Sequence, residues 1–458
     1  MKANCEAGQL TYLSLCGMLG YGFPEASLMS GLAACPAFIG VDAGSTDPGP
    51  YYLGSGKSFV HPEQTRRDLD LALVAARTHD IPLVIGSAGG AGAAPHLSGF
   101  LEILRDIARK NDLHFTLATI TADLDAEIIL RAFRQDQLRP CGPVPSLSES
   151  AIRSCSHLVG QMGTAPFIRA LQEGADVVVA GRSCDTAIFA ALPIMHGHNP
   201  ALALHSAKIA ECGTLCAVPG GANDSLLVTL DHDSFTVRPV NSQKRCTPEA
   251  VAAHSLYEQP SPHQFVEPEG TVNLRHAAFE AVDERTVRVR GTLLEPLARP
   301  TVKMEGARKV GFRSLTLAGT CDPTVIANLD SIETQVRAKV QEMTAGMPRS
   351  NELVLLFRRY GLDAVGRSCG TAKDLPAEVG LAIEAVAPSQ ELADTAVSLA
   401  RSTALHQGFP GRKTTAGNLA FPFSPSDLSG GDVYEFAVYH LLETEGLPDL
   451  FPVTMSEI

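Results

Sequence analysis

AFIGVDAGSTDPGPYYLGSG, residues 37–56, is the stretch around which we predict the fold. Residues 37–41 are apolar and predict a buried strand, and the loop that follows carries two carboxylates, small hydroxyl side chains, glycine and proline. Pro48 and Pro50 fix φ and remove N–H donors, so this loop is stiff. Open α/β sheets bind ligands at such strand ends, but the same residue types also form ordinary surface turns. The loop alone leaves both interpretations open.

The same strand-to-loop pattern recurs over the first two hundred residues. Apolar runs at 81–85, 115–120 and 176–180 predict further buried strands, and helical spacing of apolar residues lies between them. The strands are apolar throughout, as expected where helices cover both sheet faces. This alternation predicts an α/β fold with a doubly wound, mostly parallel sheet in the N-terminal half.

The pattern changes near residue 220. Short β-branched segments alternate with turn signals, and they are followed by helical patterns at 327–342 and 389–406 and by strands at 353–358 and 379–386. This order is typical of an α+β domain in which two helices cover an antiparallel sheet. We therefore expect an α/β domain over residues 1–219 and an α+β domain over residues 220–458, which completes the site or forms an interface.

Composition narrows the classes of function. The chain has 458 residues, a net charge of −13 and 45% hydrophobic residues, so we expect a globular protein that binds neither nucleic acid nor a membrane. The eleven cysteines form no CxxC pair, and the N-terminus is a poor signal peptide. These features favour reduced thiols and a cytoplasmic location.

A glycine-rich loop follows the second strand, with the sequence GSAGGAGAAPHL at residues 86–97. Backbone N–H groups of such a loop can hold a phosphate or a carboxylate, while close packing of helix on strand explains it equally well. It has neither the Walker lysine nor GxGxxG spacing, so the sequence holds no NAD or ATP motif. His96 is either a catalytic base or a helix cap. The candidate substrate-binding residues here are Gly86, Ser87, Gly89, Gly90 and His96.

Two more segments of the first domain carry charged residues at element ends. In GRSCDTAIF, residues 181–189, Arg182 can bind an anion, and Asp185 is a general base, a metal ligand or a helix N-cap. In AKIAECG, residues 207–213, Glu211 lies at a helix end beside small residues. Clustered carboxylates suit either acid/base chemistry or a divalent metal, and the cofactor stays unknown. The candidate catalytic residues are Asp42, Asp47, Asp185 and Glu211, with Ser45 as a substrate ligand.

The second half adds two candidate stretches. TVKMEGA, residues 301–307, places Lys303 and Glu305 on one face of a strand, because their spacing is two. Residues 406–428 form a long loop in which Arg412 and Asn418 are further substrate-binding candidates. A solvated basic group explains Arg412 equally well.

Eight stretches in one order resemble the acyclic terpene utilisation (AtuA-like) family. They are residues 42–54, 86–97, 160–171, 174–189, 207–213, 301–307, 311–319 and 401–428. The resemblance implies an enzyme or enzyme subunit of branched-acid catabolism that acts on a carboxylate or an acyl-CoA. Some members carry a further small C-terminal domain, which this chain is expected to lack and to receive from a small partner subunit. We also expect a homo-oligomer.

Three hypotheses follow. The first is a lyase of the hydratase or dehydratase type on a small carboxylate or CoA ester, with the four carboxylates lining one cleft and the 86–92 loop and Arg182 holding the anion. The second is an amide or ester hydrolase with Ser45 or Cys184 as nucleophile, which needs a histidine within hydrogen-bond reach. The third is a non-catalytic acyl-CoA-binding or scaffold subunit.

Overall fold

The structure is a computed structural model, and it describes residues 8–366 and 375–458. The chain divides into two compact units, Met1–Arg308 with Phe436–Ile458, and Lys309–Glu435. The boundary that we expected after residue 219 lies inside the first unit. The reason is that the antiparallel strands following residue 220 join the sheet of the N-terminal half.

The first unit is built on a ten-stranded sheet whose centre is parallel. Its order is β14-β15-β10-β9-β1-β2-β3-β7-β4-β21. The parallel strands are β1 (Leu10–Ser14), β2 (Phe38–Asp42), β3 (Leu83–Gly86), β7 (Val177–Ala180) and β4 (Thr116–Ile120). The antiparallel strands are β9 (Leu226–Leu230), β10 (Ser234–Pro239), β15 (Val287–Arg290), β14 (Ala278–Ala281) and β21 (Val453–Glu457).

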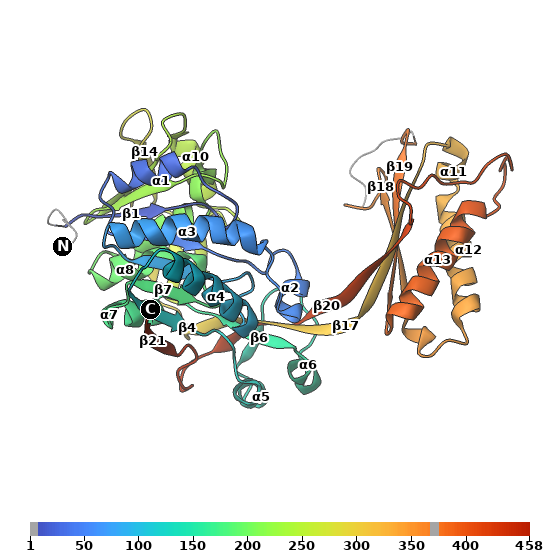
Figure 1. Ribbon diagram of the computed structural model, residues 1–458, viewed down its shortest axis with the longest axis horizontal. Coiled ribbons are helices and arrows are strands. Elements are labelled where there is room, and N and C mark those ends of the chain that lie inside the picture. Colours follow the sequence, from blue (N-terminus) through green and yellow to red (C-terminus); the bar gives the residue numbers. More distant parts are fainter. Residues whose placement is uncertain (1–7, 367–374) are drawn as a thin grey trace. The chain divides into compact units, whose positions relative to one another are not determined.

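Helices cover both faces of this sheet. The residues of β2 alternate between two buried clusters, with Phe38 in one and Ile39 and Val41 in the other. One cluster includes α1 (Glu25–Leu32), α3 (Pro62–Thr78) and α4 (Ala94–Lys110), and α3 and α4 lie side by side over the strands (Figure 1). The other includes α5 (Ala126–Arg134), α7 (Thr164–Gln172), α8 (Asp185–Met195) and α9 (Pro200–Ala210). The predicted α/β class with a mostly parallel, doubly wound sheet is confirmed.

Smaller elements complete the first unit. They are α2 (Pro50–Ser55), β5 (Leu138–Pro140), α6 (Glu149–Arg153), β6 (His157–Gln161), β8 (Ala217–Val218), β11 (Arg245–Cys246), α10 (Pro248–His254), β12 (Gln264–Glu267), β13 (Gly270–Asn273) and β16 (Leu293–Glu295). We predicted no strand before residue 37 or in residues 138–163. β1, β5 and β6 correct this, because each finds its sheet partner far along the chain.

The second unit is an α+β layer pair, as predicted. Its strands are β18 (Val354–Tyr360), β19 (Val379–Ala387) and the adjoining parts of the long strands β17 (Thr301–Thr320) and β20 (Asp427–Glu443). Its helices are α11 (Pro323–Ala327), α12 (Leu329–Thr344) and α13 (Gln390–His406). Val336 of α12 and Val397 of α13 are buried in one cluster with Ile383 of β19.

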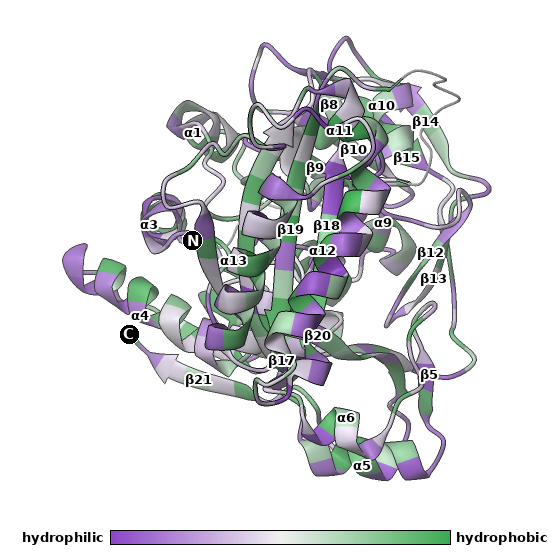
Figure 2. Cartoon of the chain, turned by 90° about the vertical axis from the view of Figure 1, so that its right-hand side faces the viewer, coloured by the Kyte–Doolittle hydropathy of each residue, from purple (hydrophilic) through white to green (hydrophobic). Residues whose placement is uncertain are grey.

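Amphipathic patterning explains the helices of both units. Green and purple bands alternate along α4 and α12 in Figure 2, as expected where one helix side faces a core and the other faces solvent. In the part of the chain that the structure describes, no helix is both long and apolar enough to cross a bilayer.

Candidate active site

Three loops meet at one edge of the parallel sheet. Asp42 ends β2 and is paired with Gly86, which ends β3. The next N–H groups, of Ser87 and Ala88, donate to the carbonyls of Gly181 (3.0 Å) and Ala180 (2.9 Å) after and within β7. These contacts tie together the strand-end loops that follow β2, β3 and β7.

Glycine makes the closest of these contacts possible. A Cβ on Gly44 would lie 1.8 Å from the carbonyl oxygen of Gly90, and a Cβ on Gly92 would lie 2.2 Å from the backbone nitrogen of Arg182. Any side chain at Gly44 would therefore push the two loops apart. The glycines allow the loops to come into contact. This agrees with the hypothesis that the glycine-rich sequence serves close packing.

A cleft of about 420 Å³ opens beside these loops in the first unit. Three of the four predicted catalytic carboxylates line it, namely Asp47, Asp185 and Glu211. The cleft also contains the predicted ligands Ser45, Arg182 and Lys303. Its other lining residues are Cys141, Gln161, Cys184, Lys208, Glu258, Gln259, Val266, Glu267, Pro268, Thr301 and Leu441.

Arg182 is held beneath this cleft by a fully buried carboxylate. Its Nε lies 2.9 Å from Oε2 of Glu305, and Lys303 Nζ lies 2.8 Å from Oε1 of the same residue. The hydroxyl oxygens of Thr46 and Ser87 accept two further hydrogen bonds from the guanidinium, at 3.2 and 3.3 Å. Burial raises the pKa of Glu305, but Arg182 and Lys303 together outweigh it and bring the pKa to about 2. Glu305 is therefore a fixed negative charge that orients both cations.

A second ion pair comes from the last turn of α9. Lys208 Nζ lies 2.5 Å from Oε1 of Glu211, and both side chains are almost fully buried. Burial raises the pKa of Glu211, and the charge of Asp185 raises it further, against the lowering effect of Lys208. Glu211 is thus a carboxyl group that gains a proton more readily than usual.

Asp42 lies behind the cleft. Its side chain is 4% exposed, and one oxygen, Oδ1, has no hydrogen-bond partner. Burial and the neighbouring charge of Asp185 raise its pKa well above the usual value. Burial likewise raises the pKa of Asp185, although Arg182 and Lys208 act against it.

Glu267 is a site residue that we did not predict. It ends β12, which pairs with β13 in a short hairpin, and its carboxyl lines the cleft. Burial and the charge of Glu269 raise its pKa to about 7. Its neighbour Glu269 accepts hydrogen bonds from the backbone N–H and the hydroxyl of Thr164, at 2.5 and 2.7 Å, and so caps α7. The sequence around Glu267, VEPEG, has no feature that distinguishes it from an ordinary turn. The tertiary fold alone places Glu267 at the cleft.

The two candidate nucleophiles have partners other than histidine. The hydroxyl of Ser45 donates to Asp47 at 2.6 Å, and the thiol of Cys184 donates to the carbonyl of Gln161 at 3.9 Å. Burial and the charges of Glu267 and Glu269 raise the pKa of Cys184 well above its usual value, so the reactive thiolate is disfavoured.

The glycine loop and His96 lie next to the cleft without lining it. The N–H groups of Ser87, Ala88 and Gly90 all donate to backbone carbonyls. His96 Nε2 lies 3.0 Å from the carbonyl of Tyr52, and burial lowers the pKa of this histidine. Ser87 contacts Arg182 through its hydroxyl. Substrate binding by Gly86, Ser87, Gly89, Gly90 and His96 stays a prediction.

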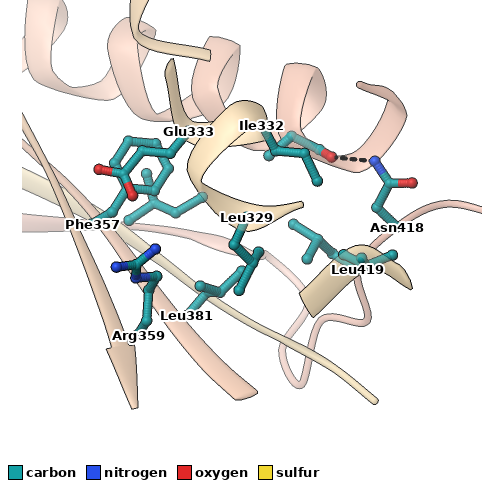
Figure 3. Close-up of a pocket in the computed structure, with 11 residues that line it drawn as sticks. Leu329, Ile332, Glu333, Phe357, Arg359, Leu381, Asn418 and Leu419 are labelled. Carbon is teal, nitrogen blue, oxygen red and sulfur yellow. Dashed lines mark hydrogen bonds between the residues drawn. The ribbon is translucent and has the colours of Figure 1, made fainter. Parts of the chain in front are cut away.

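Arg412 and Asn418 belong to the second unit. Arg412 Nε donates to Asn418 Oδ1 at 2.9 Å, and Asn418 in turn donates to the carbonyl of Ala404 at 2.9 Å. Beside Asn418, a small apolar pocket of about 10 Å³ lies between Leu329, Leu381 and Leu419 (Figure 3). A void this small holds at most one water-sized sphere, so these residues are packed core. Asn418 ties the 406–428 loop to the end of α13.

Metal ligands do not gather at one point in the described ranges, 8–366 and 375–458. Within them, no three His, Cys, Asp or Glu side chains are arranged as a metal site. The carboxylate of Glu211 in the cleft and that of Glu305 behind it are both paired with lysine or arginine.

Comparison with known protein families gives a match. The sequence pattern described as acyclic terpene utilisation family protein AtuA matches residues 60–223 and 230–424. No curated protein and no solved structure matches the chain significantly. The matched ranges include Arg182, Asp185, Glu211, Glu267 and Glu305, whereas Asp42, Ser45 and Asp47 precede them. The chain belongs to the acyclic terpene utilisation family, AtuA, as predicted.

Proposed function

We propose that this protein is a lyase of the hydratase or dehydratase type that acts on a small carboxylate or its CoA ester. The supporting observation is a single cleft in which carboxyl groups of raised pKa lie beside three cations. Membership of a family named for terpene utilisation is consistent with catabolism of branched acids.

The cations supply the binding half of this proposal. Arg182 and Lys303 are oriented by Glu305, and Lys208 is paired with Glu211. A substrate carboxylate or an enolate oxygen in the cleft would be held by these groups, which are fixed before the substrate arrives. A cleft of about 420 Å³ suits the acyl part of such a substrate.

The carboxyl groups supply the proton transfers. Dehydration removes a proton from the carbon next to the carbonyl and a hydroxide from the next carbon, and the C–H electron pair becomes the new double bond. Glu267, with a pKa of about 7, can protonate the leaving hydroxyl so that it departs as water. Asp185 and Asp47, on the same cleft, are the candidate bases. Hydration runs the same steps in reverse.

The hydrolase hypothesis receives less support. It required a histidine beside Ser45 or Cys184, whereas Ser45 donates to Asp47, and Cys184 contacts the Gln161 carbonyl and Glu267.

The test uses the full-length protein and a panel of short β-hydroxy acids, their α,β-unsaturated counterparts, and the CoA thioesters of both. Absorbance of the conjugated double bond reports turnover, and the rise in melting temperature reports binding. Glu267→Gln should lower kcat by about 10²-fold while the ligand still raises the melting temperature.

Glu280→Gln is the matched control, since this side chain is 46% exposed and is paired with Arg290 on the surface. It should keep the wild-type kcat. If no panel member is converted, or if Glu267→Gln, Asp185→Asn and Glu211→Gln all keep wild-type turnover, the lyase proposal is wrong.

A further inference from the structure

We propose that Asp42 and Asp185 share one proton and titrate as a unit, with Asp42 acting as a positioning residue behind Asp185. The use of this proton in turnover rests on the lyase proposed above. The sharing itself does not depend on any reaction.

The fold places the two side chains on the same side of the sheet. A Cβ on Gly40 would lie 2.6 Å from the ring of Phe189, which belongs to α8, so this face of β2 looks toward α8. Asp42 lies two residues further along the same strand and therefore shares that face. Asp185 is the first residue of α8. The end of β2 and the start of α8 thus each place one carboxyl group, of Asp42 and of Asp185, on this side of the sheet.

The oxygen atoms at this point lack hydrogen-bond donors. Oδ1 of Asp42, Oδ1 of Asp185 and Oγ of Ser183 are all buried and without a partner. Ser183 Oγ lies 2.5 Å from the position of a Cβ on Gly86, the residue paired with Asp42. A buried polar group left without a hydrogen bond destabilises the folded state. These oxygens have one hydroxyl proton among them, and a proton on a carboxyl group supplies the missing donor.

The surrounding charges leave the pair without a cation of its own. The hydrogen bonds of Arg182, the cation that faces both carboxyls, go to Glu305, Thr46 and Ser87. Lys208, which faces Asp185, is bound to Glu211. The other titratable groups facing the pair are Cys16, Tyr21, Asp47, Cys184, Glu211, Cys212 and Glu258.

A proton fits this place better than a metal ion. The unpartnered oxygens are closed off from solvent, Arg182 would repel a cation, and no three His, Cys, Asp or Glu side chains of the described residues are arranged as a metal site. Two close carboxylates that cannot both ionise hold one proton between them. In the proposed dehydration, Asp185 takes the proton from carbon while the pair carries one proton, and the pair then carries two until solvent removes one.

The experiment needs no substrate. Infrared spectra of the full-length protein in D₂O at neutral pH show the C=O stretch of protonated carboxyl groups. Asp42→Asn, Asp185→Asn and the double variant are compared with wild type. We expect either single substitution to remove one protonated carboxyl from the band, because the asparagine amide then donates to the remaining carboxylate. The double variant should remove no more than a single variant does.

Asp112→Asn is the matched control, because its side chain is 98% exposed, and it should leave the band unchanged. If the two single losses add up in the double variant, the groups hold separate protons and the sharing is overturned. If the substitutions leave the band unchanged, or if Mg²⁺ raises the melting temperature of wild type but not of Asp42→Asn, the pair holds no proton at neutral pH and the proposal is also overturned.

Should Asp42→Asn fail to fold, Asp185→Asn and the pH titration of the band in wild type still decide the matter. A failed substrate panel would overturn the lyase and leave the shared proton standing, while additive band losses would do the opposite.

Discussion

Glu305 shows how one residue can organise a cleft that it does not line. Its buried carboxylate orients Arg182, Lys303 and Thr46 at once. Side chains alternate between the two faces of a strand, so the sequence predicted that Glu305 and Lys303 share one face of β17. The partnership with Arg182 was not predictable, because 123 residues separate them and only the fold joins β17 to the loop after β7.

Replacing Glu305 by Gln should therefore destabilise the first unit strongly. The change removes the charge that compensates a buried guanidinium, and breaking a buried pair costs about 3–5 kcal/mol. We expect about 3 kcal/mol, because Asp42 and Asp185 also face Arg182. Unfolding in urea measures the loss. Glu280→Gln, which breaks an exposed pair, should cost under about 1 kcal/mol, and equal losses for the two variants would contradict the structural role of burial.

At the scale of elements, local pattern was sufficient for the strands of the parallel sheet and insufficient for their neighbours. Residues 37–41, 81–85, 115–120 and 176–180 predicted β2, β3, β4 and β7 to within two residues at each end. β1 and β6 were missed because their short segments contain polar residues or glycine, and their strand character comes from distant partners. For the same reason the β12–β13 hairpin and its Glu267 could not be assigned to the cleft.

The hairpin is fixed by a helix cap, and this gives the prediction for elements. Glu269 accepts two hydrogen bonds from Thr164 at the start of α7. Glu269→Ala should cost about 1–2 kcal/mol, as for loss of an N-cap, and should loosen the hairpin whose Glu267 contacts Cys184. Alkylation of Cys184, followed by peptide mass spectrometry, should then become faster than in wild type.

Ser148→Ala provides the comparison, because Ser148 caps α6 through one hydrogen bond of 3.1 Å and contributes nothing to the cleft. It should lower stability to a similar degree without changing the alkylation of Cys184. An unchanged rate in Glu269→Ala would mean that the cap does not hold the hairpin in place.

At the scale of the whole molecule, the two units divide the chain in a way that local composition could not predict. The sequence pattern does change near residue 220, from alternating strands and helices to short β-branched segments. This change marks the start of antiparallel strands that join the same sheet, and it does not mark a domain boundary. The first unit also includes the C-terminal strand β21, which pairs with β4 from more than three hundred residues away. The composition of the first unit depends on strand pairing between distant segments, and a short stretch of sequence carries no information about such pairing.

The buried acids also affect the whole molecule, because they make stability fall as pH rises through neutrality. Glu267 ionises at 4.5 in an ordinary setting and at about 7 when folded, so between these values the folded chain holds a proton that the unfolded chain has released. The free energy of unfolding therefore decreases with pH across this window, and the raised pKa of Glu211 extends the decrease to higher pH. His205 and His254 act in the opposite direction, since burial lowers their pKa values to about 3 and about 4. Their effect on stability is confined to pH values below their ordinary pKa of 6.5.

Melting temperatures should consequently fall between pH 6.5 and pH 8, where the histidines no longer contribute. The double variant Glu211→Gln/Glu267→Gln should melt with a flatter pH dependence, whatever its absolute stability, while Glu280→Gln should keep the wild-type slope. A slope that survives in the double variant would show that other groups carry the pH dependence.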